Sequence, residues 1–206
     1  MAKKIISIVI IMLLLLASFS IIVSSGSEDD PEIVDRKLDV KLFGIFPFLP
    51  QLNYKNTDWE SVWFYELEDK PDNLYVSMKV RELESDSDTY DFIYVIQWTY
   101  NNIQYGASIH LLPRGLTSYL AGILNEEGND YTQYVECDGA FDEKTNIITW
   151  IVPKESIGNP MQLTKITNII PFTVVRFPLD SGKVKFDLFK DLPWNALITQ
   201  DYTIKY

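Results

Sequence analysis

The chain has 206 residues, a formal net charge of −11 and 14% aromatic residues. A field of that sign repels phosphate backbones, so we expect no nucleic-acid partner. Cys137 is the only cysteine and His110 the only histidine. An internal disulfide and a zinc site built from several histidine and cysteine ligands are therefore excluded. We expect Cys137 to be a buried, inert thiol, because free cysteine behaves as a small apolar residue.

Residues 1–25 are typical of an export signal. Lys3 and Lys4 precede an unbroken apolar run, Ile5–Leu16, and the small residues after it suit a cleavage site. The alternative is an uncleaved anchor over residues 5–23, close to the ~20 residues needed to span a bilayer. Both interpretations place the remainder outside the cytoplasm, so we predict a secreted or extracytoplasmic protein whose only membrane contact is such an anchor.

The remainder divides into an acidic linker, residues 26–35, and one domain, residues 36–206. Without Lys3 and Lys4 the formal net charge falls from −11 to −13, because no acidic residue precedes Glu28. A chain of about 175 residues buries about 70% of its unfolded surface, so the core alone can stabilise this domain.

Segments of alternating apolar side chains, separated by polar or Pro/Gly breaks, recur along the domain. This pattern predicts an all-β fold, an antiparallel β-sandwich of jelly-roll type with one or two short helical turns. In one such segment Leu74, Val76, Met78 and Val80 form an apolar face. The intervening residues face the other way, as in a strand with one side toward water.

The clearest hairpin is centred on Asn101-Asn102, which can adopt the positive φ values of a type I′ turn. A two-residue turn predicts the register and places one set of side chains in the core: Phe92, Tyr94, Ile96, Trp98, Tyr105, Ala107 and Ile109. The opposite, mixed face carries Gln97, Gln104, Ser108 and His110. We expect that face to be covered or to form a shallow binding surface. A slip of one residue would exchange the two faces.

The segment Leu112–Gly128 allows two interpretations. The apolar residues Leu116, Tyr119, Leu120, Ile123 and Leu124 have the spacing of a short helix. Pro113 and Gly115 suit an irregular crossover instead.

The next two predicted strands, Tyr131–Cys137 and Ile147–Val152, pair across a polar connection. Pro153 ends the second strand, because proline lacks the backbone donor of a ladder. Lys154–Gly158 then makes one helical turn that the glycine stops. Residues 201–206 alternate again, so we expect the end of the chain to lie in a sheet.

Five segments together resemble a family of exported prokaryotic, archaeal β-sandwich domains of unassigned function. They are Ser61–Glu66, Asn73–Val80, Tyr100–Gly106, Ile148–Lys154 and Asp201–Tyr206. The architecture of that family is similar to family 9 carbohydrate-binding modules and DOMON-type domains. That resemblance implies a β-sandwich, with sugar or haem as the ligand classes of the similar folds.

Trp59 and Trp194 lie near the ends of predicted strands, where an aromatic ring can form an exposed platform for a sugar ring. With Gln97, Gln104 and His110 they form the predicted glycan-binding set. Trp98 and Trp150 lie inside strands, and we expect both rings in the core.

The acidic segment Glu84–Asp91 places Asp86, Asp88 and Asp91 close together in one loop. Carboxylate oxygens at such spacing suit Ca²⁺, so these three residues are the candidate calcium ligands. The alternative, which the composition favours, is a solvated acidic turn, since the glycine and distal glutamate of an EF-hand loop are absent.

These features favour a non-catalytic binding or surface module with carbohydrate as the leading ligand class. One alternative is a cell-envelope domain that binds another protein. A glycoside-acting enzyme is the weaker alternative, because abundant carboxylates pair by chance and no Gly-x-Ser-x-Gly elbow is present. We therefore assign no catalytic residue.

Overall fold

The computed structural model describes residues 26–35, 41–42, 56–84, 91–112, 115–178, 185–191 and 198–206. The predicted signal or anchor, residues 1–25, lies outside the described residues. Within the described part, no helix is long and apolar enough to cross a membrane. The predicted linker at 26–35 contains strand β1, so part of that segment belongs to the sheet and does not act as a tether.

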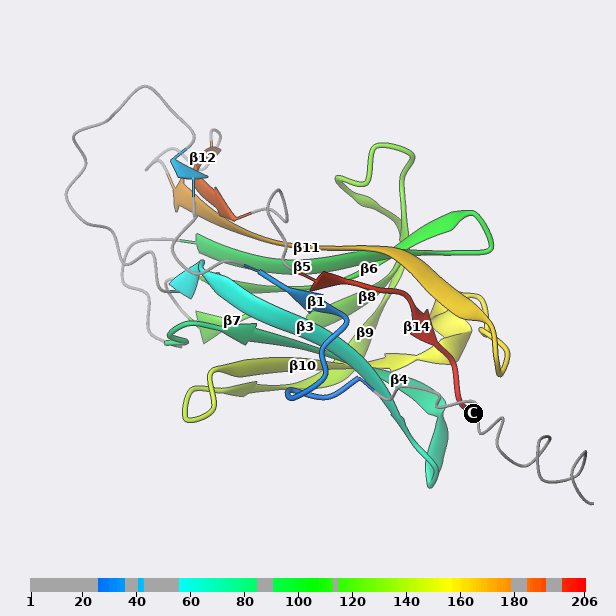
Figure 1. The fold of residues 1–206 in the computed structure, drawn as a ribbon. Coiled ribbons are helices and arrows are strands. Elements are labelled where there is room, and N and C mark those ends of the chain that lie inside the picture. The colour runs from blue at the N-terminus through cyan, green and yellow to red at the C-terminus, as the bar shows by residue number, and fades with distance from the viewer. Residues whose placement is uncertain are drawn as a thin grey trace, which may run out of the picture.

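The described residues form an all-β fold, as predicted (Figure 1). Its long strands are β3 (Trp59–Leu67), β4 (Lys70–Val80), β5 (Asp91–Tyr100), β6 (Ile103–Leu112), β8 (Tyr119–Leu124), β9 (Tyr131–Asp142), β10 (Ile147–Pro153), β11 (Lys165–Pro178) and β12 (Lys185–Asp191). Its two-residue strands are β1 (Ile33–Val34), β2 (Lys41–Leu42), β7 (Gly115–Leu116), β13 (Ile198–Thr199) and β14 (Tyr202–Thr203).

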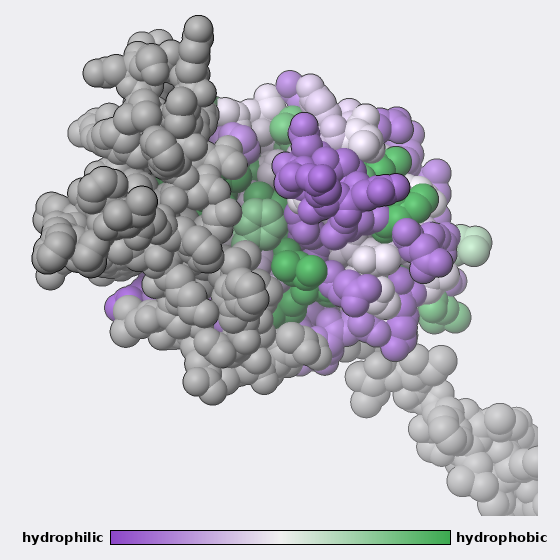
Figure 2. Space-filling view, turned by 90° about the horizontal axis from the view of Figure 1, so that it is seen from above, coloured by the Kyte–Doolittle hydropathy of each residue, from purple (hydrophilic) through white to green (hydrophobic). Residues whose placement is uncertain are grey.

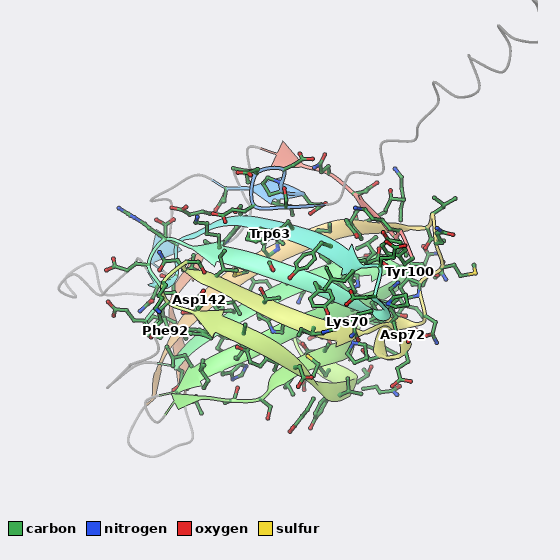
Figure 3. All side chains as sticks on the ribbon, turned by 90° about the horizontal axis from the view of Figure 1, so that it is seen from below. Trp63, Lys70, Asp72, Phe92, Tyr100 and Asp142 are labelled. Carbon is green, nitrogen blue, oxygen red and sulfur yellow. The ribbon has the colours of Figure 1, made fainter. Side chains whose placement is uncertain are left out.

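All strand pairs are antiparallel, and the sheet curls into a half-barrel. Its strand order is β13-β1-β3-β4-β10-β9-β8-β6-β5-β11-β12-β2. The first part of β9, Tyr131–Cys137, pairs with β8, and the part after it, Asp138–Asp142, pairs with β10, so the two layers expected of a sandwich are continuous through this strand. The predicted pairing of Tyr131–Cys137 with β10 is therefore wrong, because β9 extends five residues beyond the predicted strand. Figure 3 shows the β3, β4, β10 and β9 wall from below, with Trp63 on β3 and Asp142 at the end of β9.

The predicted hairpin between β5 and β6 is confirmed. Asn101 and Asn102 have φ values of 49° and 61°, as a type I′ turn requires. The predicted register is also confirmed, with Trp98 opposite Tyr105 and Ile96 opposite Ala107. All seven side chains assigned to the inner face of this hairpin are buried.

The core fills the space between the two walls of the half-barrel. Phe64 on β3 contacts the edge of Trp98 on β5, with ring centroids 5.8 Å apart, and stacks on Tyr202 of β14 at 5.6 Å. The four apolar residues of β4, Leu74, Val76, Met78 and Val80, are fully buried as predicted. The expectation that the opposite face lies toward water is wrong at Tyr75 and Ser77, which are 5% and 1% exposed. Large aromatic rings and aliphatic side chains thus share this core, and their burial stabilises the domain.

The segment predicted as a short helix or crossover forms strands β7 and β8 instead. The reason is that β8 is apolar on both faces. Ala121 lies in the core, and Ile123 packs against the core from the same face of β8. Leu120 and Leu124 lie on the opposite face, in the groove described below. When both faces of a strand are apolar, the apolar residues include pairs three and four positions apart, which is also the spacing of an amphipathic helix. The side chains nevertheless point alternately to the two faces, as in any strand.

The turn after β10 is a 3-10 helix, Lys154–Ile157, and it agrees with the predicted helical turn. Gly158 ends it in the left-handed conformation, with φ of 80°. Ile157 is 1% exposed and belongs to the core, so this turn closes one end of the half-barrel.

The last residues of the chain join the two sides of the fold. β13 pairs with β1, and β14 pairs with β11, although both short strands belong to residues 198–206. The predicted pairing of this segment in a sheet is thus confirmed. The fold has no disulfide, so these backbone pairings and the contacts beneath them hold the two sides together.

A buried carboxylate holds this C-terminal segment in place. Glu66 Oε2 accepts hydrogen bonds from the Tyr202 hydroxyl at 3.0 Å and the Lys205 backbone N–H at 2.6 Å. Glu66 Oε1 forms an ion pair with Lys154 Nζ at 2.5 Å, and the Glu66 side chain is 0% exposed. Lys154 Nζ also donates to the backbone oxygen of Tyr206. The charge is therefore both paired and hydrogen-bonded, which a buried charge requires.

Replacing Glu66 by alanine leaves the buried Lys154 ammonium without its anion. We expect the variant to lose about 3–5 kcal/mol of unfolding free energy, measured by urea denaturation. Asp201→Ala is the control, because Asp201 pairs with Lys165 at 3.4 Å on the surface and should cost less than about 1 kcal/mol. Equal losses in the two variants would contradict the assigned role of Glu66.

A second buried carboxyl, Glu32, lies beside strand β3. Its Oε2 accepts a hydrogen bond from the Phe64 backbone N–H at 2.8 Å, and the residue is 1% exposed. Gly26 packs so closely that a side chain at that position would overlap the Glu32 carboxyl. Burial, aided by the negative charge of Asp30, raises the pKa of Glu32 from 4.5 to about 7, although the Phe64 bond opposes the shift.

A raised carboxyl pKa makes the folded state hold a proton that the unfolded chain releases. Stability from Glu32 is complete below about pH 4.5, falls as pH rises toward the folded pKa of about 7, and is level above it. The fall amounts to about 3 kcal/mol. Glu32→Gln should flatten that part of the stability curve in urea titrations at a series of pH values. An unchanged curve in the variant would show that other groups cause the dependence.

Candidate ligand-binding groove

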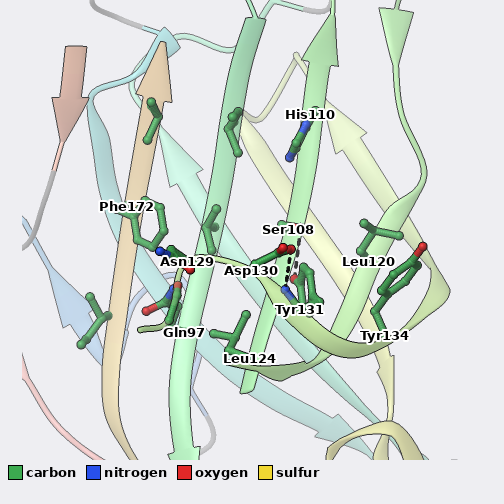
Figure 4. Close-up of a pocket in the computed structure, with 15 residues that line it drawn as sticks. Gln97, Ser108, His110, Leu120, Leu124, Asn129, Asp130, Tyr131, Tyr134 and Phe172 are labelled. Atoms are coloured by element: carbon green, nitrogen blue, oxygen red, sulfur yellow. Dashed lines mark hydrogen bonds between the residues drawn. The ribbon is translucent and has the colours of Figure 1, made fainter. Parts of the chain in front are cut away.

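A groove of about 690 Å³ lies on the outer face of the β5–β6 hairpin and its neighbouring strands (Figure 4). Strands β11, β5, β6 and β8, the start of β9 and the β8–β9 loop contribute its lining. The lining residues are Ile93, Val95, Gln97, Ser108, His110, Leu120, Leu124, Gly128, Asn129, Asp130, Tyr131, Tyr134, Ile170, Phe172 and Val174.

The floor of the groove is a second apolar cluster, separate from the core. Ile93, Val95 and Val174 form this cluster, and Phe172 packs against it. Strand periodicity explains the separation, since the neighbours of Ile93 and Val95 along β5 point into the half-barrel. The same two strands thus supply both the core and the groove floor.

One wall of the groove is the loop between β8 and β9, residues 125–130. Gly128 has a φ of 69°, a left-handed conformation that suits glycine. Its carbonyl oxygen accepts a hydrogen bond from Gln97 Nε2 at 2.5 Å. The Tyr131 hydroxyl donates to Ser108 Oγ at 3.1 Å. These two bonds fasten the loop to the hairpin face.

The loop is also braced internally. Asn129 N–H donates to Asn125 Oδ1 at 3.1 Å, and Asn125 Nδ2 donates to Asn129 Oδ1 at 2.7 Å. From above, apolar side chains gather beside a projecting hydrophilic lobe (Figure 2). The groove therefore combines an apolar floor with a polar wall of fixed shape.

Two side chains of the predicted glycan-binding set line the groove, namely Gln97 and His110. Gln104 lies beside the loop, with its Oε1 3.2 Å from the position that a Cβ would take at Gly128, but it does not line the groove. Trp194 lies outside the described residues.

The expectation of an exposed platform at Trp59 is wrong. Trp59 is 0% exposed and belongs to the main core. It is the first residue of β3, and its ring points between the two walls of the half-barrel. Position near a strand end did not reveal which face of the strand the ring occupies.

The predicted calcium ligands are only partly described. Asp86 and Asp88 lie outside the described residues, and Asp91 begins β5 with 3% exposure. Within the described ranges, no group of three His, Cys, Asp or Glu side chains could hold a metal ion. Calcium binding by the acidic segment stays a prediction.

Sequence reasoning missed the groove residues outside the hairpin. Tyr134 is 59% exposed, and the centroid of its ring lies 5.9 Å from the centroid of the Tyr131 ring. Phe172 shares the parity of Val174 on β11, which marks both as lying on one face. That parity was visible in the sequence, but the neighbouring position of β11 and β5 was not.

Two groups with raised pKa values are the Cys137 thiol and the Tyr131 hydroxyl. Cys137 is half-buried, where full burial was predicted, and it packs against the main core. Burial raises the pKa of its thiol to about 12, a direction that agrees with the predicted inert cysteine. Burial likewise raises the pKa of Tyr131 to about 12, although its bond to Ser108 opposes the shift. Both groups are neutral under physiological conditions.

No family model, curated protein or solved structure matches the chain. The resemblance to exported β-sandwich domains therefore stays a prediction, and the functional argument rests on the groove itself.

Proposed function

We propose that the protein is a non-catalytic, extracytoplasmic binding module and that the groove over β11, β5, β6 and β8 binds carbohydrate. The observation that carries the proposal is the combination, in one groove, of an apolar floor with hydrogen-bonding side chains at its edge. A sugar ring has the matching chemistry, with apolar C–H faces and a rim of hydroxyls. The groove volume is within the range of small-molecule sites.

Individual residues take distinct parts in this proposal. The exposed Tyr134 ring offers a face on which a sugar ring can stack. Asn129, Asp130 and His110 offer polar atoms at the edge. Export follows from the signal-like residues 1–25, and an apolar leader retained as an anchor would leave the groove outside the cell.

Replacing Tyr134 by alanine removes the stacking face, and we expect it to weaken glycan binding about three- to tenfold. Binding is measured first on a glycan array and then by calorimetry with the retained glycans. Met161→Ala is the matched control, because Met161 is 68% exposed and lies outside the groove. Both variants should unfold within about 0.5 kcal/mol of the parent. Retention of no glycan, or unchanged binding by the Tyr134 variant, would refute the proposal.

A second candidate function, protein–protein contact in the cell envelope through self-association of the chain, is supported by the loop before β11. Met161 and Leu163 are 68% and 60% exposed, and Leu163 has a φ of 64°. A left-handed leucine costs about 1–3 kcal/mol and persists only where its surroundings impose it. Here the Leu163 N–H donates to the Ile204 carbonyl at 2.8 Å, and Gln162 Nε2 donates to the Lys205 carbonyl at 2.6 Å.

If this loop is a contact surface between copies of the chain, sedimentation velocity should show a dimer that dissociates in the Met161→Ser, Leu163→Ser double variant. Loss of two apolar contacts should weaken the dimer by more than about tenfold. Ile103→Ser is the control, because Ile103 is 42% exposed on the β5–β6 turn. A monomer at every concentration would remove self-association as the role of the loop.

A further inference from the structure

The charge around the groove is negative. Among the described lining residues, Asp130 is the sole carboxylate and none is lysine or arginine. Glu126 and Glu127 belong to the same wall. Together they place three carboxylates in a loop of six residues beside an apolar floor.

Hydrogen bonds orient these carboxylates before any ligand arrives. Asp130 Oδ1 accepts from the Tyr131 backbone N–H at 2.8 Å. Glu127 Oε2 accepts from Asn129 Nδ2 at 2.8 Å. The hydrogen bonds from Gln97 to Gly128 and from Tyr131 to Ser108 hold the loop that carries these carboxylates. Two of the three carboxylates, Asp130 and Glu127, thus have hydrogen-bond partners within the loop while both residues stay exposed to solvent.

We infer that the groove selects glycans that carry a protonated amine, and discriminates against glycans that carry carboxylate or sulfate groups. This inference rests on the proposed function. An ammonium group supplies donors to the oriented carboxylates while its sugar ring covers the apolar floor. An acidic sugar would bring like charge to the same wall without a lysine or arginine among the described lining residues to offset it.

The overall charge of the chain acts in the same direction. The formal charge of −13 without the two leader lysines attracts cationic ligands from a distance and repels anionic ones. Local selection and long-range attraction can be separated by comparing the loss of Asp130 and Glu127 with the loss of two carboxylates elsewhere on the surface, because both changes reduce the overall charge equally.

The test is calorimetry with three oligosaccharide series of equal length: β-linked glucosamine, its N-acetylated form and an oligouronate. We expect the amine series to bind about fivefold more tightly than the acetylated series, the usual size of an exposed ion pair. The oligouronate should bind most weakly. The amine advantage should disappear in about 1 M salt, because screening then acts within about 3 Å.

The variant Asp130→Asn, Glu127→Gln should lose the amine advantage while keeping its affinity for the acetylated series. Glu68→Gln, Asp72→Asn, at two exposed positions outside the groove, removes the same two charges, so it is the control for net charge and should keep the advantage. Tighter binding of the acetylated series or the oligouronate, with the Tyr134→Ala effect retained, would overturn the inference and leave the proposed function standing. Binding of none of the three, together with an empty glycan array, would refute both.

Discussion

The two-residue turn at Asn101–Asn102 sets the register on which both the core and the groove depend. With that turn, Trp98 lies opposite Tyr105 and their rings face inward, while Gln97 and Ser108 face outward. A slip of one residue would exchange the two faces. Both asparagines have positive φ, so the local backbone conformation, and not packing alone, decides which side of the hairpin faces the core and which side lines the groove.

The two walls of the half-barrel are joined on one side through β9. Without a further connection, the opposite side, between β1 and β11, would stay open. The C-terminal residues connect the two walls, because β13 pairs with β1 and β14 pairs with β11. Glu66 holds this segment through its hydrogen bond from the Tyr202 hydroxyl. Small secreted domains commonly use disulfides to hold such segments together. This chain has one cysteine, and it uses a buried ion pair with hydrogen-bonded partners instead. Such an ion pair favours one position of the C-terminal segment, because any other position would leave the buried charge with fewer partners.

The groove is a consequence of sheet architecture. Five neighbouring strands each place alternate side chains on the outer face, and the loop between β8 and β9 stands over them as a wall. On this face Ile93, Val95 and Val174 form an apolar cluster of their own, with Phe172 packed against it. The polar groups come from the loop and the hairpin, so their mutual positions depend on the bonds from Gln97 and Tyr131.

Sequence alone determined the elements whose signals are local. Period two predicted the inner face of β4, the Asn-Asn turn predicted the β5–β6 register, and Pro153 with Gly158 predicted the end of β10 and the turn after it. The outer face of the hairpin was predicted to be covered or to form a shallow binding surface, and three of the polar residues assigned to that face, Gln97, Ser108 and His110, line the groove. Those signals reside in backbone preferences and alternation, which act within a few residues.

Only the tertiary structure decided the rest. It placed Trp59 in the core, turned the helix-like spacing of Leu120 and Leu124 into a strand with two apolar faces, and brought Phe172 and Tyr134 to one groove. Each of these outcomes depends on which strands become neighbours. That choice follows from burial summed over the whole chain, and a window of a few residues does not contain it.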